Sequence, residues 1–195
     1  MMRYLLVIVF FSLSLLSCGK DPIPKPQAYL RLEYPEANYA EESIEGLPFT
    51  FEKNILATKV LTKPLKGDTK SYGITIEYPS MDGTIYLTYK DIEKNKEYLS
   101  TFLKDAQNFT QEHTIKADEI SEQVYANKSQ NVYGMFYEVG GNAASQSQFY
   151  VTDSINHFLT GSLYFYAKPN YDSILPAAYY LQNDIRKIME SIKWK

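Results

Sequence analysis

The sequence predicts an α+β domain in which an antiparallel sheet packs against two main amphipathic helices, preceded by an extended N-terminal arm. First, most segments after Leu47 alternate apolar and polar residues with a period of two, which is typical of strands with one buried face. Second, tight turns connect successive segments, and such turns favour antiparallel pairing. Third, two longer segments change to helical periodicity, and amphipathic helices need a sheet face to cover.

The first half of the domain is predicted to contain strands and one helix. The strands lie at residues 48–54, 56–62, 71–79 and 83–90. A loop that carries lysine and glycine, Lys63–Lys70, separates the second strand from the third. Asp82-Gly83 is a strong turn signal between the third and fourth, which predicts a hairpin. Residues 92–110 then place their apolar side chains on one face of a helix: Leu99, Phe102, Leu103, Ala106 and Phe109.

The second half is predicted to contain four more strands and a final helix. The strands lie at residues 120–126, 131–140, 145–153 and 156–166. The helix repeats apolar residues at spacings of three and four: Ile174, Ala178, Leu181, Ile185, Ile188 and Ile192. Asp172 or Ser173 is the predicted N-cap, and Pro176 is tolerated in a first turn. This order of elements is similar to that of the Mog1/PsbP-like sandwiches, in which an antiparallel sheet lies between helices.

The chain begins with an apolar segment that follows one basic residue, Arg3. The segment runs from Tyr4 to Ser17, which is too short for a membrane-spanning helix of about 20 residues. A secretory signal peptide has a basic start, a short apolar segment and a small residue before the cleavage site. We therefore predict that residues 1–17 are a signal peptide.

Cys18, the only cysteine, directly follows this signal. Leu15-Leu16-Ser17-Cys18 resembles the lipobox of bacterial lipoproteins, in which the thiol receives a diacylglycerol and the new amino group is acylated. The resemblance implies that the mature chain starts at Cys18 and is anchored to membrane lipid, because several acyl chains hold far more firmly than one. An acylated Cys18 leaves no thiol for disulfides, catalysis or metal binding. The alternatives are a plain signal peptide, or a short buried helix with a chance cysteine.

We divide the mature chain into a tether with an extended arm, residues 18–46, and a single domain, residues 47–195. The tether has a proline at every second position: Pro22, Pro24 and Pro26. This spacing favours an extended, polyproline-like spacer. Residues 28–36, "AYLRLEYPE", alternate with a period of two and predict an edge strand or an extended arm. Residues 36–46 carry several glutamates and predict an acidic loop.

Charge and motif content argue against nucleic-acid binding and catalysis. The formal net charge is −3, and no basic run reaches the density of a nucleic-acid footprint. Motifs such as HExxH, GxGxxG and GxSxG do not occur. His113 and His157 lie far apart and belong to no ligand-spaced motif, so we expect them to be structural or solvated. We therefore expect a non-enzymatic protein without a cofactor, metal or nucleic-acid partner, and with no identified small-molecule substrate.

The chain is rich in tyrosine, with 18 Tyr and 10 Phe against one Trp. Several tyrosines on the predicted strands share a possible sheet face: Tyr133, Tyr137, Tyr150, Tyr164 and Tyr166. If that face is exposed, the rings can stack on sugars or on a partner strand. If a helix covers it, the rings fill the interface between sheet and helix. The sequence alone leaves both alternatives open.

One N-terminal signature resembles a known family. Residues 24–36, "PKPQAYLRLEYPE", joined to the lipobox and a body of this size, resemble the gliding-motility lipoproteins of the GldD family. The resemblance implies a membrane-anchored, non-enzymatic component required for gliding motility and for the associated type IX secretion apparatus, in contact with other proteins of that machinery. By the same resemblance a partner-docking arm is expected at Pro24, Lys25, Pro26, Tyr29, Arg31, Tyr34 and Pro35. The alternative is an arm that packs on its own domain.

The residues after Cys18 bear on location. In enteric bacteria an aspartate at the next position causes retention in the inner membrane; here Gly19 stands there, which favours the outer membrane. Lys20-Asp21 is too short to resemble the acidic export tag of surface-displayed lipoproteins. We therefore expect a lipid-anchored envelope protein that faces the periplasm. The alternative function is a cell-envelope glycan-binding module with a tyrosine-rich sheet face.

Overall fold

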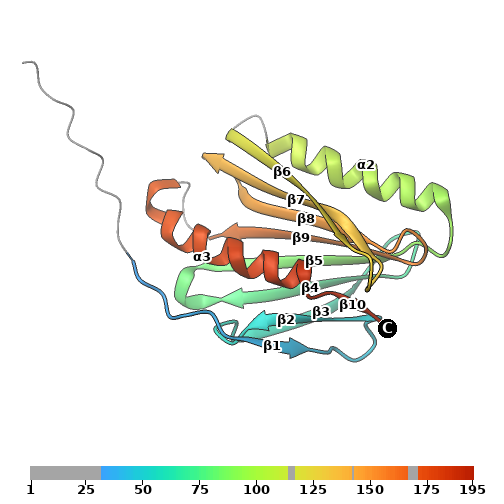
Figure 1. Ribbon diagram of the computed structural model, residues 1–195, viewed down its shortest axis with the longest axis horizontal. Coiled ribbons are helices and arrows are strands. Elements are labelled where there is room, and N and C mark those ends of the chain that lie inside the picture. Colours follow the sequence, from blue (N-terminus) through green and yellow to red (C-terminus); the bar gives the residue numbers. More distant parts are fainter. Residues whose placement is uncertain (1–31, 114–116, 142, 167–170) are drawn as a thin grey trace, which may run out of the picture.

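The computed structural model describes residues 32–113, 117–141, 143–166 and 171–195. They form a seven-stranded sheet, a smaller three-stranded sheet and two long helices (Figure 1), so the predicted α+β class is confirmed. The predicted signal peptide, Cys18 and the arm as far as Arg31 lie outside the described residues. No helix within the described ranges is both long and apolar enough to cross a membrane.

The large sheet is antiparallel throughout, with the strand order β3-β4-β5-β9-β8-β7-β6. Its strands are β3 (Lys59–Leu65), β4 (Ser71–Tyr78), β5 (Gly83–Asp91), β6 (Ala117–Asn127), β7 (Val132–Gly141), β8 (Ser145–Thr152) and β9 (His157–Phe165). Each matches a predicted strand, although the ends are displaced. The loop predicted at Lys63–Lys70 is wrong at its start, because β3 continues through Pro64 to Leu65. An edge strand such as β3 tolerates proline, which a central strand does not.

The hairpin predicted between β4 and β5 is confirmed. A short 3₁₀ turn, η2 (Pro79–Met81), connects the two strands. Asp82 follows it in the left-handed region, with φ 48°, a conformation that Asp adopts more readily than most residues. The Asp82-Gly83 pair therefore supplies the turn that its sequence indicates.

The two helices, α2 (Lys96–His113) and α3 (Tyr171–Glu190), pack on opposite faces of the large sheet. Neighbouring residues of a strand point to opposite faces. On β8, Phe149 belongs to the core that contains Leu181 of α3, whereas Tyr150 belongs to the core that contains Phe102 of α2. The sheet therefore lies between helices, as the element order predicts.

The larger core lies between α3 and the sheet. Of the apolar residues predicted for this last helix, Ile174 is half-buried and the others are buried: Ala178, Leu181, Ile185, Ile188 and Ile192. Ile192 lies beyond the end of α3. The predicted start of the helix is wrong, because α3 begins at Tyr171 and therefore contains Asp172 and Ser173 instead of being capped by them. Pro176 then lies beyond the first turn. Proline lacks the N–H that a helix interior needs, and for that reason the sequence suggests a later start.

The small sheet has the order β1-β2-β10 and consists of β1 (Tyr39–Glu42), β2 (Phe49–Asn54) and β10 (Lys193–Trp194). Only β2 is predicted by the sequence, and the acidic loop predicted over residues 36–46 is wrong where β1 forms. Lysines from other elements offset the acidic side chains: Lys193 Nζ lies 3.7 Å from Glu41, and Lys53 Nζ lies 3.7 Å from Glu42. The two-residue β10 is too short to show a period.

Candidate functional site

One face of the large sheet carries adjacent tyrosine, hydroxyl and amide side chains. A first row across β5, β9 and β8 consists of Tyr86, Ser162 and Gln148. The next row consists of Thr88, Thr160 and Tyr150. Because Tyr150 belongs to the core beneath α2, strand alternation puts both rows on the face that α2 partly covers.

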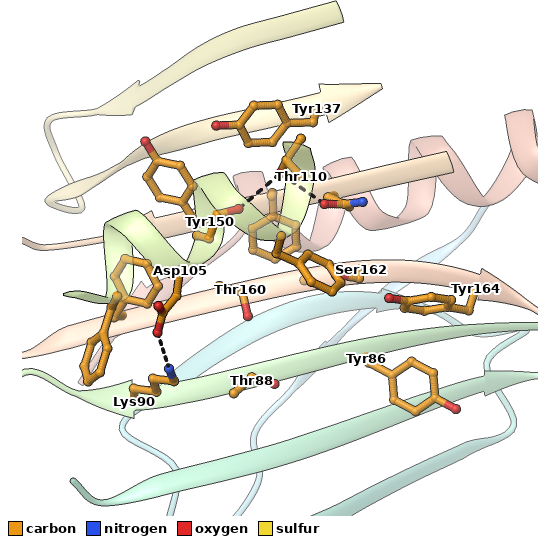
Figure 2. A pocket seen from close by; sticks show the side chains of 17 residues that line it. Tyr86, Thr88, Lys90, Asp105, Thr110, Tyr137, Tyr150, Thr160, Ser162 and Tyr164 are labelled. Carbon is orange, nitrogen blue, oxygen red and sulfur yellow. Dashed lines mark hydrogen bonds and ion pairs between the residues drawn. The ribbon is translucent and has the colours of Figure 1, made fainter. Parts of the chain in front are cut away.

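A cavity of about 330 Å³ lies between α2 and these rows (Figure 2). Helix α2 contributes Phe102, Asp105, Ala106, Phe109 and Thr110 to its lining. Figure 2 shows Lys90 and Asp105 at one end of the cavity, and Tyr86 and Tyr164 at the other. The lining therefore combines one helix face with side chains from several neighbouring strands.

The inner wall of the cavity is aromatic. The rings of Tyr150 and Phe158 stack, with centroids 5.9 Å apart and planes inclined by 11°. The ring of Phe102 packs against that of Phe158, with centroids 5.6 Å apart. Burial raises the pKa of Tyr150, and together with neighbouring groups it raises the pKa of Tyr137 to about 12. Both phenols therefore stay protonated at neutral pH.

Gln148 presents its side chain to the cavity although it is only 2% exposed. The Thr110 hydroxyl donates a hydrogen bond to Gln148 Oε1 at 3.1 Å, which holds the amide in place. Gln148 Nε2 is buried and has no hydrogen-bond partner in the part of the chain that the structure describes. Because an unpaired buried donor costs about 1–3 kcal/mol, this amide marks a point where the cavity can gain from a polar ligand.

The remaining polar groups of the cavity carry no net charge. Lys90 Nζ lies 3.7 Å from Asp105 Oδ2, so the two charges at this end offset each other. The other hydroxyl groups belong to Thr88, Thr160 and Ser162. Within the described ranges, no hydrogen bond occupies these three hydroxyls. Each can both donate and accept.

This arrangement offers ring faces, hydroxyls and one amide to a ligand, held on a rigid sheet. The described residues that line the cavity include no histidine or cysteine. Among the residues that the structure describes, no group of three or more His, Cys, Asp or Glu side chains is placed to hold a metal ion. The side chains that line the cavity can hold a ligand by hydrogen bonds and ring contacts.

Comparison with known proteins assigns the chain to a family. The family model described as gliding motility lipoprotein GldD matches residues 19–194. The chain belongs to this family. The match spans the arm, both helices and the strands that build the cavity, so the resemblance seen in the N-terminal signature is confirmed over most of the chain. No curated protein and no solved structure matches the chain.

Membership of this family establishes two coarse properties. The family is a lipoprotein family, which fits a membrane-anchored location in the cell envelope. It is also linked to gliding motility, which fits partners in that machinery in general.

The end of the predicted docking arm lies against α3. The Tyr34 ring packs on the ring of Tyr180, with centroids 5.2 Å apart and planes inclined by 51°. Burial raises the pKa of Tyr34, whereas Pro35 is exposed. The other predicted site residues lie outside the described part of the chain: Cys18, Pro24, Lys25, Pro26, Tyr29 and Arg31.

The five tyrosines predicted to share a sheet face do so, on the side of α2. Tyr137 and Tyr150, which are 5% and 9% exposed, fill the interface with the helix. Tyr164 lines the outer end of the cavity, and Tyr166 is 73% exposed. Sequence reasoning missed Tyr86, whose ring meets that of Tyr164 edge-on at 5.8 Å and whose hydroxyl pairs with that of Tyr166. This face is thus covered by the helix at Tyr137 and Tyr150 and exposed at Tyr166.

A second polar cluster surrounds Asp184 in the larger core. This residue is 1% exposed and accepts hydrogen bonds from Tyr39 Oη at 2.8 Å and Asn54 Nδ2 at 3.2 Å. Burial raises the pKa of Asp184, although the hydrogen bonds oppose that shift. Because the cluster joins β1, β2 and α3 and is enclosed, we interpret it as structural.

A third cluster surrounds His157, the first residue of β9. Its Nδ1 lies 2.9 Å from the Tyr89 hydroxyl, and its ring stacks on Trp194 with centroids 4.9 Å apart. Burial lowers the pKa of His157, opposed by Asp153 and Asp91. These contacts attach β10 to the large sheet, which accounts for the buried side of this histidine.

Proposed function

We propose that this protein is a lipid-anchored envelope component that supports gliding motility and the associated type IX secretion apparatus through contact with other proteins. The observation that carries the proposal is the family match over residues 19–194. The protein acts without catalysis, and its two buried polar clusters stabilise the body.

Deletion of the gene tests the cellular role. Cells that lack the gene should stop spreading on agar and should no longer release type IX cargo proteins into the medium. A copy of the gene on a plasmid should restore both properties. Deleted cells that spread and secrete normally would contradict the whole assignment. If cells that lack the gene secrete normally but do not spread, the proposed role in secretion is contradicted and the role in gliding stands.

The anchor is acylated Cys18, on the outer membrane and facing the periplasm. Cells fed a clickable palmitate analogue should label the protein, and a Cys18→Ala variant should carry no label. Label that persists in the variant would contradict lipidation at this residue. Separation of the two membranes on a density gradient, and protease treatment of intact cells, test the membrane and the side.

The arm is the segment through which partners dock. The Tyr34–Tyr180 contact ties the end of the arm to α3, while Leu32 and Pro35 remain exposed and available to a partner. A photo-crosslinking residue at Arg31 should give a discrete adduct in living cells. The same probe at exposed Lys128, in the turn between β6 and β7, is the control. Equal adducts from both positions, or none from Arg31, would contradict a docking arm.

A second candidate function is binding of cell-envelope glycan, which the cavity beneath α2 and its tyrosines favour. Purified peptidoglycan and surface polysaccharide should then retain the protein in a pull-down. A pure assembly factor should remain in the supernatant. This experiment separates the two candidates without depending on motility.

A further inference from the structure

We propose that the cavity beneath α2 binds a short, neutral saccharide. This inference rests on the glycan-binding candidate and names its site and ligand class. Three independent features carry it: a buried amide with an unpaired donor, tyrosine rings at the outer end, and a hydroxyl-lined floor without net charge.

The first feature is the fixed amide of Gln148. Thr110 occupies its Oε1, and Nε2, which is buried and has no partner among the described residues, is the donor that a ligand has to pair. A site that forms a hydrogen bond with a hydroxyl or amide of its ligand rejects analogues that lack this group. The reason is that such an analogue leaves a buried polar group of the site without a partner. A sugar hydroxyl, or the carbonyl of an N-acetyl group, supplies the acceptor that this amide needs.

The second feature is the pair of rings at the outer end. Tyr86 and Tyr164 meet at 68° with centroids 5.8 Å apart, and the hydroxyl pair with Tyr166 helps to fix the Tyr86 ring. The face of an aromatic ring is weakly negative. It therefore attracts the weakly positive C–H groups that line one side of a sugar ring.

The third feature is the row of free hydroxyls on the floor. Thr88 and Thr160 are direct cross-strand neighbours, and Ser162 lies one row away on the same strand as Thr160. Cross-strand neighbours on one face lie about 5 Å apart at Cβ. Hydroxyls at that spacing, each able to donate and accept, can pair with different hydroxyls of one sugar.

Two other ligand classes fit the cavity less well. An acyl chain would leave the Gln148 amide and the floor hydroxyls buried without partners, which is costly. An anion would meet the Asp105 carboxylate, while Lys90, the one cationic side chain that the described residues contribute to the lining, is already paired with it. The volume of about 330 Å³ lies near the lower end of ligand pockets, about 300–1,000 Å³, and therefore suits a short saccharide.

Calorimetric titration of the full mature protein tests the proposal. The protein keeps its anchor and is held in a detergent without a sugar headgroup. The probes are short oligosaccharides of N-acetylglucosamine and of glucose. At least one should bind saturably, and Tyr86→Ala and Gln148→Leu should each weaken binding about tenfold, the equivalent of one or two lost contacts. The matched control is Tyr179→Ala, because Tyr179 is 59% exposed on α3 and lies far from the cavity lining.

A folding defect is separated from a binding defect by a milder variant. Thr160→Val keeps the shape of a half-buried side chain and removes only its hydroxyl, and it should weaken binding several-fold while the circular dichroism spectrum stays unchanged. Absence of binding to both probes would overturn the proposal, and so would affinity that none of the cavity variants changes. Saturable binding of a fluorescent fatty acid that the same cavity variants abolish would also overturn it.

The same variants separate this proposal from the candidate on which it rests. If peptidoglycan retains the cavity variants as well as the unmodified protein, the cavity proposal fails and glycan binding stands. If glycan does not retain even the unmodified protein, both fail. Retention that the cavity variants abolish and Tyr179→Ala preserves supports both.

Discussion

Replacement of Tyr34 by alanine should loosen the arm without unfolding the body. The ring centroids of Tyr34 and Tyr180 lie 5.2 Å apart, inside the range in which an aromatic pair contributes about 0.5–1.5 kcal/mol beyond its buried area. Tyr34 is half-buried, so it also loses part of the roughly 1.5–3 kcal/mol that full burial of a large apolar side chain contributes. We therefore expect a loss of about 1–2 kcal/mol in the free energy of unfolding.

Urea unfolding of the mature protein, followed by circular dichroism, measures this loss. A double-mutant cycle with Tyr180→Ala isolates the ring–ring contribution, which we expect at about 0.5–1.5 kcal/mol. The cycle is needed because Tyr180 Oη also accepts a hydrogen bond from Asn54 Nδ2 at 3.0 Å, and Tyr180→Ala removes that bond too. Tyr34→Phe is the matched control, because it keeps the ring and should retain most of the stability.

A coupling energy near zero would refute the reasoning, since the contact would then contribute nothing. The same variant also separates the two alternatives for the arm. Normal spreading of cells that carry Tyr34→Ala, together with the stability loss, supports an arm that packs on its own domain. A loss of spreading that Tyr34→Phe does not cause supports a docking arm whose orientation depends on this ring.

Three further predictions concern the body. Leu181→Ala, at a fully buried position, should lower the free energy of unfolding in urea by about 2–5 kcal/mol, whereas the exposed Tyr179→Ala should change it by about 0.5 kcal/mol or less. Gly134→Ala should yield insoluble protein, because its new Cβ would lie 1.8 Å from a carbonyl oxygen of β8; Gly67→Ala, with its nearest neighbours at 3.8 Å, should remain soluble. Burial raises the pKa of Asp184 above its value in the unfolded chain. The free energy of unfolding should therefore fall as pH rises from about 4 through the folded-state pKa. In urea titrations between about pH 4 and 8, Asp184→Asn should flatten this pH dependence.

Each of these predictions has an outcome that contradicts it. Equal losses for Leu181→Ala and Tyr179→Ala would contradict the placement of the α3 core. Soluble, fully folded Gly134→Ala protein would contradict the close approach of β7 and β8. If the free energy of unfolding changes with pH equally in Asp184→Asn and in the unmodified protein, another group controls the pH dependence.

The sequence predicts the strands and helices whose signal is local. The apolar and polar pattern along the chain identifies all seven strands of the large sheet, the edge strands β3 and β6 as well as central strands such as β8 that contribute to both cores. The spacing of Leu181, Ile185 and Ile188 likewise identifies the buried side of α3. Such patterns depend on a few neighbouring residues and need no knowledge of pairing.

The features that the sequence missed depend on distant partners. Strand β1 begins with Tyr39, whose hydroxyl reaches Asp184 across 145 positions in the sequence. Tyr86 joins Tyr164 only because β5 pairs with β9, and neither register nor strand order can be read from alternation. The five tyrosines could be assigned to one face from their spacing, while the cavity that three of them line could not be predicted.

The arm and the cavity lie on opposite faces of the large sheet, and this bears on how the two candidate functions relate. Tyr34 packs on Tyr180 beside the larger core, the side covered by α3, whereas Gln148 and Tyr86 line the cavity on the side of α2. A partner that engages the arm therefore does not have to cross the cavity, and a saccharide in the cavity does not have to displace the arm. Attachment to the gliding machinery and contact with envelope glycan are thus compatible in one molecule, so evidence for either function leaves the other to be tested separately.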